Sequence, residues 1–378
     1  MGGASDVRVL DVELRDFRTY TRAQAALGPG LNVVHGPNGA GKSNLLEALY
    51  FGCTARSQRT RNERELIRFD APVTRVVVHT TDGEHEHQLS VAYGAGPDGE
   101  RGVKRMTADG APVERLLDVD FRPLLGVFEP DRLELIKGAP AARRAHLDQL
   151  VAGIWPLRAA QRREYSRVLA QRNALLARIR GGRASQSTLA AWDRELAVAA
   201  IAVREHRQSA VGLLSDPFRE RAAQLGLAGE TELSYKPRSR AADADEFIAE
   251  LQARLPSDLE RGFSGHGPHR DELAVLRDGR ELRSYGSQGE QRLALLALLL
   301  AERSVLERER GRTPLMLLDD VMSELDAERR ELLANELSAG GQSVIATTDL
   351  AHVPGGGESR VTRLRVGTGT ILQEALAA

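Results

Sequence analysis

GPNGAGKS, at residues 36–43, is the stretch that decides the fold of this chain of 378 residues. It fits G-x-x-x-x-G-K-[ST], the pattern of a phosphate-binding P-loop. The apolar run at 31–34 predicts a strand just before it, and residues 44–50 predict the first turns of a helix just after it. Strand, glycine loop and helix in this order are the context that the motif requires, so the sequence predicts a nucleotide site.

The chemistry of this loop follows from its residue types. Glycines let the backbone turn its N–H groups inward around phosphate oxygens, and a helix start adds free N–H groups and partial positive charge. Lys42 can reach the β- and γ-phosphates, and the Ser43 hydroxyl can ligate Mg²⁺. The alternative, a glycine-rich turn that happens to precede Lys-Ser, is disfavoured because the chain has only four lysines. The residues expected to contact the nucleotide are Gly36, Pro37, Asn38, Gly39, Ala40, Gly41, Lys42, Ser43 and Asn44.

The bulk properties predict a protein of two lobes that lies in the cytoplasm. A chain of 378 residues is too long for one compact domain, and 42% hydrophobic residues suffice for a core. No run of about 18 uncharged apolar residues occurs, so we expect no membrane-spanning helix and no membrane partner. Residues 1–6 lack the features of a signal peptide. Cys53 is the single cysteine, which excludes an internal disulfide and fits the cytosol.

Charge is informative in its distribution rather than in its sum. The net charge is −1 and the pI is about 6.8, which argues neither for nor against nucleic acid. Residues 143–183 hold ten arginines and two acids, and residues 56–64 hold four arginines and one acid. Such runs are candidates for phosphate contacts, but an arginine-rich composition that merely decorates solvent-exposed helices explains them about equally well.

The first third of the chain reads as the P-loop unit plus antiparallel strands. Partial alternation of apolar and polar residues at 7–14 predicts a half-buried strand. Asp82-Gly83 and Asp109-Gly110 each separate two strand-like runs, which is a hairpin signal.

The middle of the chain reads as helical. Helical patterns at 140–180 and 187–225 flank Gly181-Gly182 and predict an antiparallel arm, with an optional break at Asp216-Pro217. A short strand at 232–235 and a helix at 243–255 follow. The alternative is a plain helical subdomain with no ligand.

Two carboxylates end an apolar strand in the last third. Residues 315–318 are apolar and lead into Asp319 and Asp320, as expected of a buried parallel strand whose carboxyl end faces a ligand. Asp319 can hold the Mg²⁺ shell, and Asp320 can orient or deprotonate the attacking water. The alternative is a strand end that caps a helix. A further apolar strand at 343–349 ends in hydroxyls, and Asp278-Gly279 marks a third hairpin.

Together these motifs resemble the ATPase head of the ABC/SMC superfamily. Ser287, Gln288, Gly289 and Glu290 resemble its signature loop, which caps the γ-phosphate of an ATP held by a second subunit. The resemblance therefore implies ATP, and two ATP molecules in a head-to-tail homodimer. Residues 323–326 match the loop that crosses the dimer interface, and Thr348 lies where many such proteins carry a switch histidine.

The similarity extends further to the RecF family of recombination and repair proteins. The matching segments cover nearly the whole chain in order and lie at 14–20, 128–133, 138–148, 267–273, 285–289 and 317–321. The resemblance implies an α/β fold, an ABC/SMC-type P-loop ATPase head with an antiparallel β subdomain, interrupted by a helical arm domain. The expected domains are the first head half at 1–113, the arm at 114–262 and the second head half at 263–378.

The family resemblance also implies the function. Such proteins bind ATP, dimerise on it, bind single-stranded, gapped and duplex DNA without reading sequence, and act with RecO- and RecR-like partners in recombinational repair and the SOS response. Gln288 replaces the first glycine of the common signature, and Asp320 replaces the usual glutamate. A shorter carboxylate sits farther from the water, so we expect a weak ATPase. Lys42, Asp319, Asp320 and Thr348 are the expected catalytic residues, with Ser43 and Asp319 as metal ligands.

DNA contacts are expected first at Arg56, Arg59 and Arg61, beside the P-loop helix, and second at the arm arginines. Arg15 and Arg18 are adenine candidates from position alone. Residues 267–271 are interpreted as a turn that packs the arm onto the head. The alternatives are an ABC-type ATPase subunit of a transporter or SMC-like complex, and a small-molecule P-loop kinase.

Overall fold

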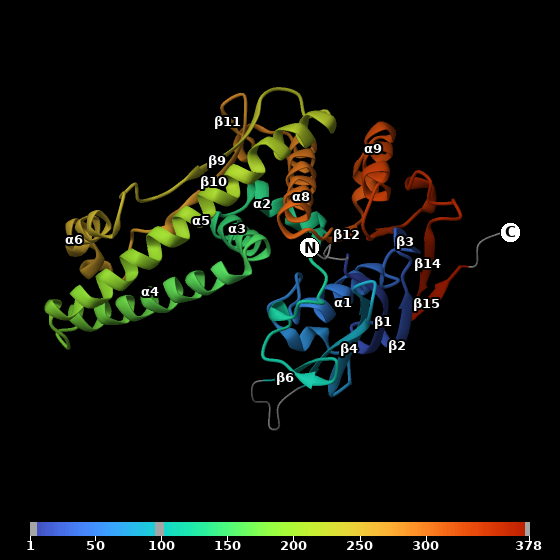
Figure 1. Ribbon diagram of the computed structural model, residues 1–378, viewed down its shortest axis with the longest axis horizontal. Helices are drawn as coiled ribbons and strands as arrows, with labels where there is room; N and C mark the ends of the chain where they lie inside the picture. Colours follow the sequence, from blue (N-terminus) through green and yellow to red (C-terminus); the bar gives the residue numbers. More distant parts are fainter. Residues whose placement is uncertain (1–5, 95–101, 375–378) are drawn as a thin grey trace. The chain divides into compact units, whose positions relative to one another are not determined.

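The computed structural model describes residues 6–94 and 102–374 and divides the chain into two compact units (Figure 1). The first unit comprises the chain up to Asp131 together with the chain from Leu306, and the second runs from Arg132 to Val305. The segment that resembles the signature loop therefore lies in the second unit. The sequence-based division after residues 113 and 262 followed motifs rather than contacts and stays a prediction.

A six-stranded, mainly parallel sheet forms the base of the first unit among the described residues. Its order is β15 (Thr370–Gln373), β14 (Thr362–Gly367), β3 (Leu31–His35), β13 (Ser343–Thr347), β12 (Leu315–Asp319) and β8 (Leu125–Phe128). Only β15 pairs antiparallel. The central strands are buried on both faces, which explains their nearly continuous apolar sequences.

An antiparallel sheet of the first unit confirms the predicted β subdomain. Its order is β2 (Tyr20–Ala26), β1 (Arg8–Phe17), β4 (Val73–Thr81), β5 (Glu86–Gly94), β6 (Val103–Ala108) and β7 (Ala111–Pro112). The hairpins predicted at Asp82-Gly83 and Asp109-Gly110 are both present. Asp109 and Gly110 have φ of 48° and 80°, the left-handed pair that a two-residue hairpin turn requires.

Helix α1 (Lys42–Thr54) contacts strands of both sheets, so it is buried almost all round. Its buried residues include Leu45, Leu46 and Leu49, and the fully buried Glu47. A helix in this position cannot show an amphipathic pattern, because no face of it meets solvent over its length. Helix α9 (Ala327–Ser338) follows β12, with η8 (Val321–Glu324) between them.

Helices dominate the second unit, and α4 and α5 run side by side (Figure 1). The elements are α2 (Glu134–Lys137), α3 (Pro140–Ile154), α4 (Ala159–Arg180), α5 (Leu189–Gln224), α6 (Ala244–Arg261), α7 (Leu282–Tyr285) and the part of α8 (Gln288–Arg310) that precedes Leu306. A small antiparallel sheet joins β9 (Thr231–Lys236), β10 (Glu272–Arg277) and β11 (Arg280–Glu281). The predicted arm around Gly181-Gly182 and the third hairpin are confirmed.

The long helix predicted at 140–180 is wrong in one respect, because it breaks between α3 and α4. Trp155 has φ −129° and ψ 85°, outside the helical region. The following Pro156 lacks an N–H group and disfavours helical backbone at the residue before it, which accounts for the break.

At two prolines the helix continues where the sequence predicted or allowed its end. Helix α5 continues through Pro217, where the sequence allowed a break, and α6 continues through Pro256, although we predicted its end at residue 255. A proline inside a helix costs about 3 kcal/mol. Contacts beyond each proline offset that cost, since Phe218 is fully buried and Asp258 is buried in an ion pair.

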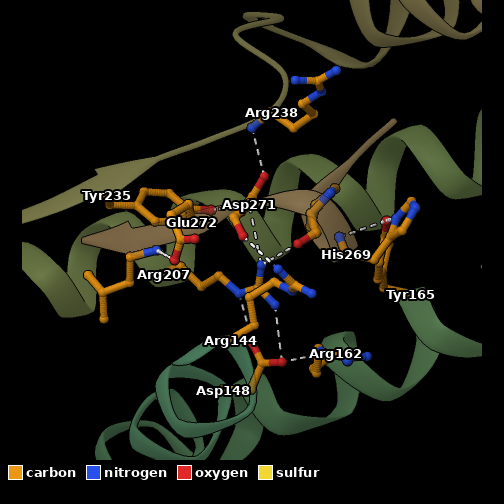
Figure 2. A network of polar contacts seen from close by, with 12 residues as sticks. Arg144, Asp148, Arg162, Tyr165, Arg207, Tyr235, Arg238, His269, Asp271 and Glu272 are labelled. Carbon is orange, nitrogen blue, oxygen red and sulfur yellow. Dashed lines mark hydrogen bonds and ion pairs between the residues drawn. The ribbon is translucent and has the colours of Figure 1, made fainter. Parts of the chain in front are cut away.

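The segment at residues 267–271 forms the short helix η7 (Pro268–Arg270) and contacts the arm helices (Figure 2). Tyr165 of α4 and His269 share a hydrogen bond of 2.7 Å between Oη and Nδ1. Arg207 of α5 donates to the Pro268 carbonyl oxygen at 2.7 Å. The predicted turn is therefore confirmed, whereas its packing against the head stays a prediction.

Asp271 is the centre of a buried polar network in the second unit (Figure 2). Its carboxylate accepts from the Arg238 backbone N–H at 2.8 Å, from Arg207 Nη1 at 3.2 Å and from the Tyr235 hydroxyl. Arg207 also binds both carboxylate oxygens of Asp148, at 2.8 and 3.1 Å. One carboxylate thus connects β9, α5 and, through Arg207, α3.

Candidate nucleotide site and signature loop

The P-loop, Asp319 and Thr347 meet at one edge of the parallel sheet. Strand β13 pairs in parallel with both β3 and β12, so all three carboxyl ends point the same way. The P-loop follows β3, Asp319 ends β12 and Thr347 ends β13. Residues more than 300 positions apart in sequence therefore form one site, as expected for an open α/β sheet.

Three glycines give the P-loop its shape. Gly36, Gly39 and Gly41 have φ of 154°, 75° and 115°. At Gly36 a Cβ atom would lie 2.2 Å from the Val366 carbonyl oxygen, and at Gly41 it would lie 2.9 Å from the Tyr20 hydroxyl oxygen. Glycine is therefore required at both positions by close backbone and ring approach as well as by φ.

The start of α1 is open to an anion. Gly41 is its N-cap and, among the described residues, no side chain caps the helix or places an acid in its first turn. The first N–H groups of a helix lack partners within it, and the helix dipole adds positive charge there. A loop of this shape that leads into an uncapped helix fits a phosphate group.

Lys42 is held at the inner side of the loop. Its Nζ donates to the Gly36 and Pro37 carbonyl oxygens at 2.8 and 3.0 Å. Burial lowers the pKa of Lys42, while the charges of Asp319 and Asp320 raise it. The ammonium group is thus poised beside the expected phosphate position with two carboxylates to balance its charge.

Ser43, Asp319 and Asp320 form a donor set that fits a hard divalent cation. Burial raises the pKa of Asp319, and a hydrogen bond from the Ser43 side chain lowers it. One carboxylate oxygen of Asp320 is buried without a hydrogen-bond partner among the described residues. Hydroxyl and carboxylate oxygens are the ligands that Mg²⁺ prefers, and a cation would relieve the buried carboxylates. The predicted metal ligands are therefore brought together.

Asp320 has an unusual backbone. Its φ is 50° and its ψ is 22°, the left-handed region, and its N–H donates to the Ala346 carbonyl oxygen at 3.0 Å. Backbone strain of this kind gathers at functional sites. The conformation turns the chain from β12 into η8, where the Ser323 hydroxyl donates to the Asp320 carbonyl oxygen at 2.8 Å.

Sequence reasoning missed Glu47, which organises the polar groups beside the P-loop. Although fully buried, it accepts from Arg18 Nε and Nη2 at 2.9 Å each and from the Ser57 hydroxyl at 2.6 Å. It also pairs with Arg59 at 3.5 Å, and Arg59 donates to Asn44 Oδ1 at 3.0 Å. A glutamate among the apolar residues at 45–49 was the available signal, since buried acids need partners.

The three arginines expected to contact DNA differ in their freedom. All three are exposed, but Arg59 is held by Glu47 and Asn44. Among the arm arginines, Arg143 is buried against Glu272, and Arg172 is fully buried between Asp193 and Asp258. Part of the positive charge of residues 143–183 therefore serves the fold rather than a ligand.

A polar contact that the sequence did not predict connects the loop after α1 with the end of β8. Gln58 Nε2 donates to Glu129 Oε1 at 2.5 Å, and Glu129 is buried. Thr348 is exposed just beyond β13. Thr347 is buried instead, and its hydroxyl donates to the Asp349 carbonyl oxygen at 3.0 Å.

The signature-like loop forms the start of α8 in the second unit. The Ser287 hydroxyl accepts from the Glu290 N–H at 3.3 Å, and Glu290 Oε2 accepts from the Ser287 N–H at 2.7 Å, a reciprocal capping box. That backbone hydrogen bond, followed by the one from Arg277, lowers the pKa of Glu290. Ser287, Gln288 and Gly289 remain exposed, so the loop is free to meet a further molecule.

None of the described helices is long and apolar enough to cross a membrane. A family model described as "AAA domain, putative AbiEii toxin, Type IV TA system" matches residues 31–348. This match begins at β3 and ends just after β13, so it includes all three strands of the site.

Curated relatives resemble nearly the whole chain. A DNA replication and repair protein RecF of Herpetosiphon aurantiacus is 37% identical over 377 residues, which cover 95% of this chain and 98% of the relative. A DNA replication and repair protein RecF of Streptomyces avermitilis is 36% identical over 97% of this chain and 99% of its own.

Solved structures agree with this and confirm the predicted fold class. The recombination mediator protein RecF with ATP, of the RecFOR pathway, superposes with a TM-score of 0.87 at 26% identity, covering 99% of both chains. The Smc head domain of Pyrococcus furiosus superposes with a TM-score of 0.59 at 17% identity, covering 98% of this chain and 97% of its own. The latter is evidence for the fold alone.

Proposed function

The chain belongs to the RecF family of DNA replication and repair proteins, and from this premise we propose that it is an ATP-driven DNA-binding switch of recombinational gap repair. The observation that carries the proposal is the junction of the P-loop, Ser43 and Asp319 at one sheet edge. ATP binding favours a head-to-tail homodimer that closes on DNA, and slow hydrolysis resets it. We further propose a cytoplasmic location, a role in the SOS response, and RecO- and RecR-like partners, as the family resemblance implies.

The residues divide the work of nucleotide binding. The loop N–H groups and the start of α1 hold phosphate oxygens, and Lys42 moves from the Gly36 and Pro37 carbonyls to the phosphates. Ser43 and Asp319 would hold Mg²⁺, which would supply positive charge to neutralise the phosphates. In this proposal the P-loop of the first unit binds the nucleotide. The signature-like loop contacts the nucleotide that a second copy holds.

Asp320 is proposed to position the attacking water. We expect Asp320→Asn to lower ATP turnover at least about tenfold, because an amide cannot accept a proton, while ATP affinity stays near that of the parent. The measurement is steady-state phosphate release beside nucleotide binding. Asp243→Asn is the matched control, because asparagine caps α6 as well as aspartate does and Asp243 is not among the residues predicted for the site. An Asp320→Asn variant that hydrolyses ATP as fast as the parent would show that Asp320 does not take part in the reaction.

Substitution of Ser287 tests the proposed ATP-dependent dimerisation. We expect the parent to shift from one copy to two in gel filtration with ATP but not with ADP. Ser287→Arg should bind nucleotide and stay single, because the larger side chain occupies the exposed helix start where the partner's γ-phosphate would lie. Ser209→Arg, on an exposed position of α5, is the control for an added arginine. A parent that stays single at saturating ATP would contradict the clamp.

DNA contact is proposed at Arg56 and Arg61, with Arg59 as a link between that loop and the P-loop helix through Asn44. Contacts to phosphates alone make affinity fall steeply with salt and ignore sequence. The alternative function is an ABC-type ATPase subunit of another machine. Gapped DNA distinguishes the two, because it should change the ATPase rate only of a repair switch.

A further inference from the structure

A hollow of about 420 Å³ in the second unit is lined by arginines and one aromatic ring. Its lining residues are Arg238, Arg261, Phe263, Gly265 and Arg270. They come from the end of β9, the end of α6 and the helix η7, so separate elements converge on it. Its size lies within the range of small-ligand sites, roughly 300–1,000 Å³.

The three guanidinium groups carry unbalanced charge. Among the described residues, none of Arg238, Arg261 and Arg270 forms a salt bridge. Two acids close in sequence to Arg261 and Arg270 are engaged elsewhere, since Asp258 pairs with Arg172, and Asp271 pairs with Arg207 and Tyr235. These two carboxylates are thus neutralised by other residues, and the side chains of the three arginines are exposed to solvent.

The buried network holds the arginines in place (Figure 2). The Asp271 carboxylate accepts a hydrogen bond of 2.8 Å from the backbone N–H of Arg238, and the Arg238 side chain points away from the network. Burial, followed by the charges of Arg270 and Arg144, lowers the pKa of His269 next to the hollow. The positive potential is therefore built into the turn at residues 267–271 rather than spread over a mobile tail.

Phe263 supplies a surface for stacking. Its side chain is 40% exposed, which is uncommon for so large an apolar group, and Arg270 lies over its ring at 5.8 Å. Planar guanidinium forks match phosphate oxygens, and an exposed ring matches the face of an unpaired base. A base within a duplex could not reach the ring, so the combination favours single strands.

We propose that this arginine pocket, formed by Arg238, Arg261, Phe263 and Arg270, binds a phosphate group of single-stranded nucleic acid and stacks the adjoining base on Phe263. Its residues belong to the second unit, whereas the predicted DNA contacts at Arg56, Arg59 and Arg61 belong to the first. Only the choice of nucleic acid as ligand rests on the proposed function. The pocket needs no ATP and no second copy, so its failure and that of the clamp are distinguishable.

The test measures binding of a fluorescent oligothymidylate of about 12 nucleotides to the full chain without ATP, in an Arg56→Ala, Arg61→Ala background that weakens the other proposed site. The comparison ligand is an abasic oligomer of equal length. We expect the thymidylate to bind more tightly, and Phe263→Ala to lower its affinity about tenfold and abolish the difference. Phe69→Ala, at a ring that is 84% exposed in the first unit, is the control.

The arginines are tested by salt dependence. We expect Arg238→Ala with Arg270→Ala to weaken both oligomers at least about tenfold and to reduce the salt slope by about 1.4, roughly 0.7 for each lost contact. Alanine at 238 keeps the N–H bond to Asp271, so melting temperature should not change. Arg194→Ala, with a side chain that is 74% exposed, is the control. Binding within twofold of the parent, equal affinity for the abasic oligomer, or equal displacement by polyglutamate would overturn the proposal.

Discussion

Replacing Lys42 with alanine should lower the affinity for ATP at least about a hundredfold. The ammonium group donates to two backbone carbonyl oxygens of the loop and would contact two phosphates when ATP binds. Charge-assisted hydrogen bonds are worth about 1.5–3 kcal/mol each, and 1.4 kcal/mol is tenfold in affinity. The measurement is titration calorimetry with ATP and with ADP, and the loss should be larger for ATP.

The control for this experiment is Lys236→Ala, which removes a half-exposed lysine paired with Glu281 at 3.0 Å. A surface pair of that kind contributes about 1 kcal/mol at most, so ATP affinity should not change. Melting temperature should be nearly the same in both variants. If Lys42→Ala bound ATP within threefold of the parent, the phosphates could not lie in this loop.

The parts of the site that lie next to each other in sequence were predictable. Strand β3, the P-loop and α1 are continuous, and glycine spacing alone defines the turn. Asp319 was also predictable, because an apolar strand that ends in acids places them at the ligand edge. These predictions needed local pattern and one topological rule, and no knowledge of side-chain partners.

The parts that depend on distant partners were not predictable. Glu47 is buried because Arg18 and Arg59, one on each side of it in sequence, both reach it. Helix α6 passes Pro256 because Asp258, two residues further on, is held by Arg172 of α4. The pattern of a single segment records neither fact, since the energy comes from another segment. The same reasoning explains why an arginine-rich run was ambiguous, for Arg172 is a core residue of the arm.

Asp271→Ala should destabilise the second unit by about 3–5 kcal/mol, the effect expected when one member of a buried ion pair is removed. Arg207 is 2% exposed and would keep only Asp148 as its acidic partner, while the Tyr235 hydroxyl and the Arg238 N–H would lose their acceptor. Hydrogen exchange of α4 and α5 is the suitable measurement, because a protein of two units need not unfold in one step.

A second change separates charge from packing in the same network. Arg207→Met combined with Asp271→Asn removes both charges of the ion pair. The double variant should therefore lose less stability than the sum of the losses of the two single variants. Asp216→Ala is the control, because its 87% exposed carboxylate pairs with Arg219 at the surface and contributes little. Because Asp271 also anchors Arg238, loss of protection in α5 should accompany weaker oligothymidylate binding. Stability lost without any change in binding would show that the network supports the arm but not the arginine pocket.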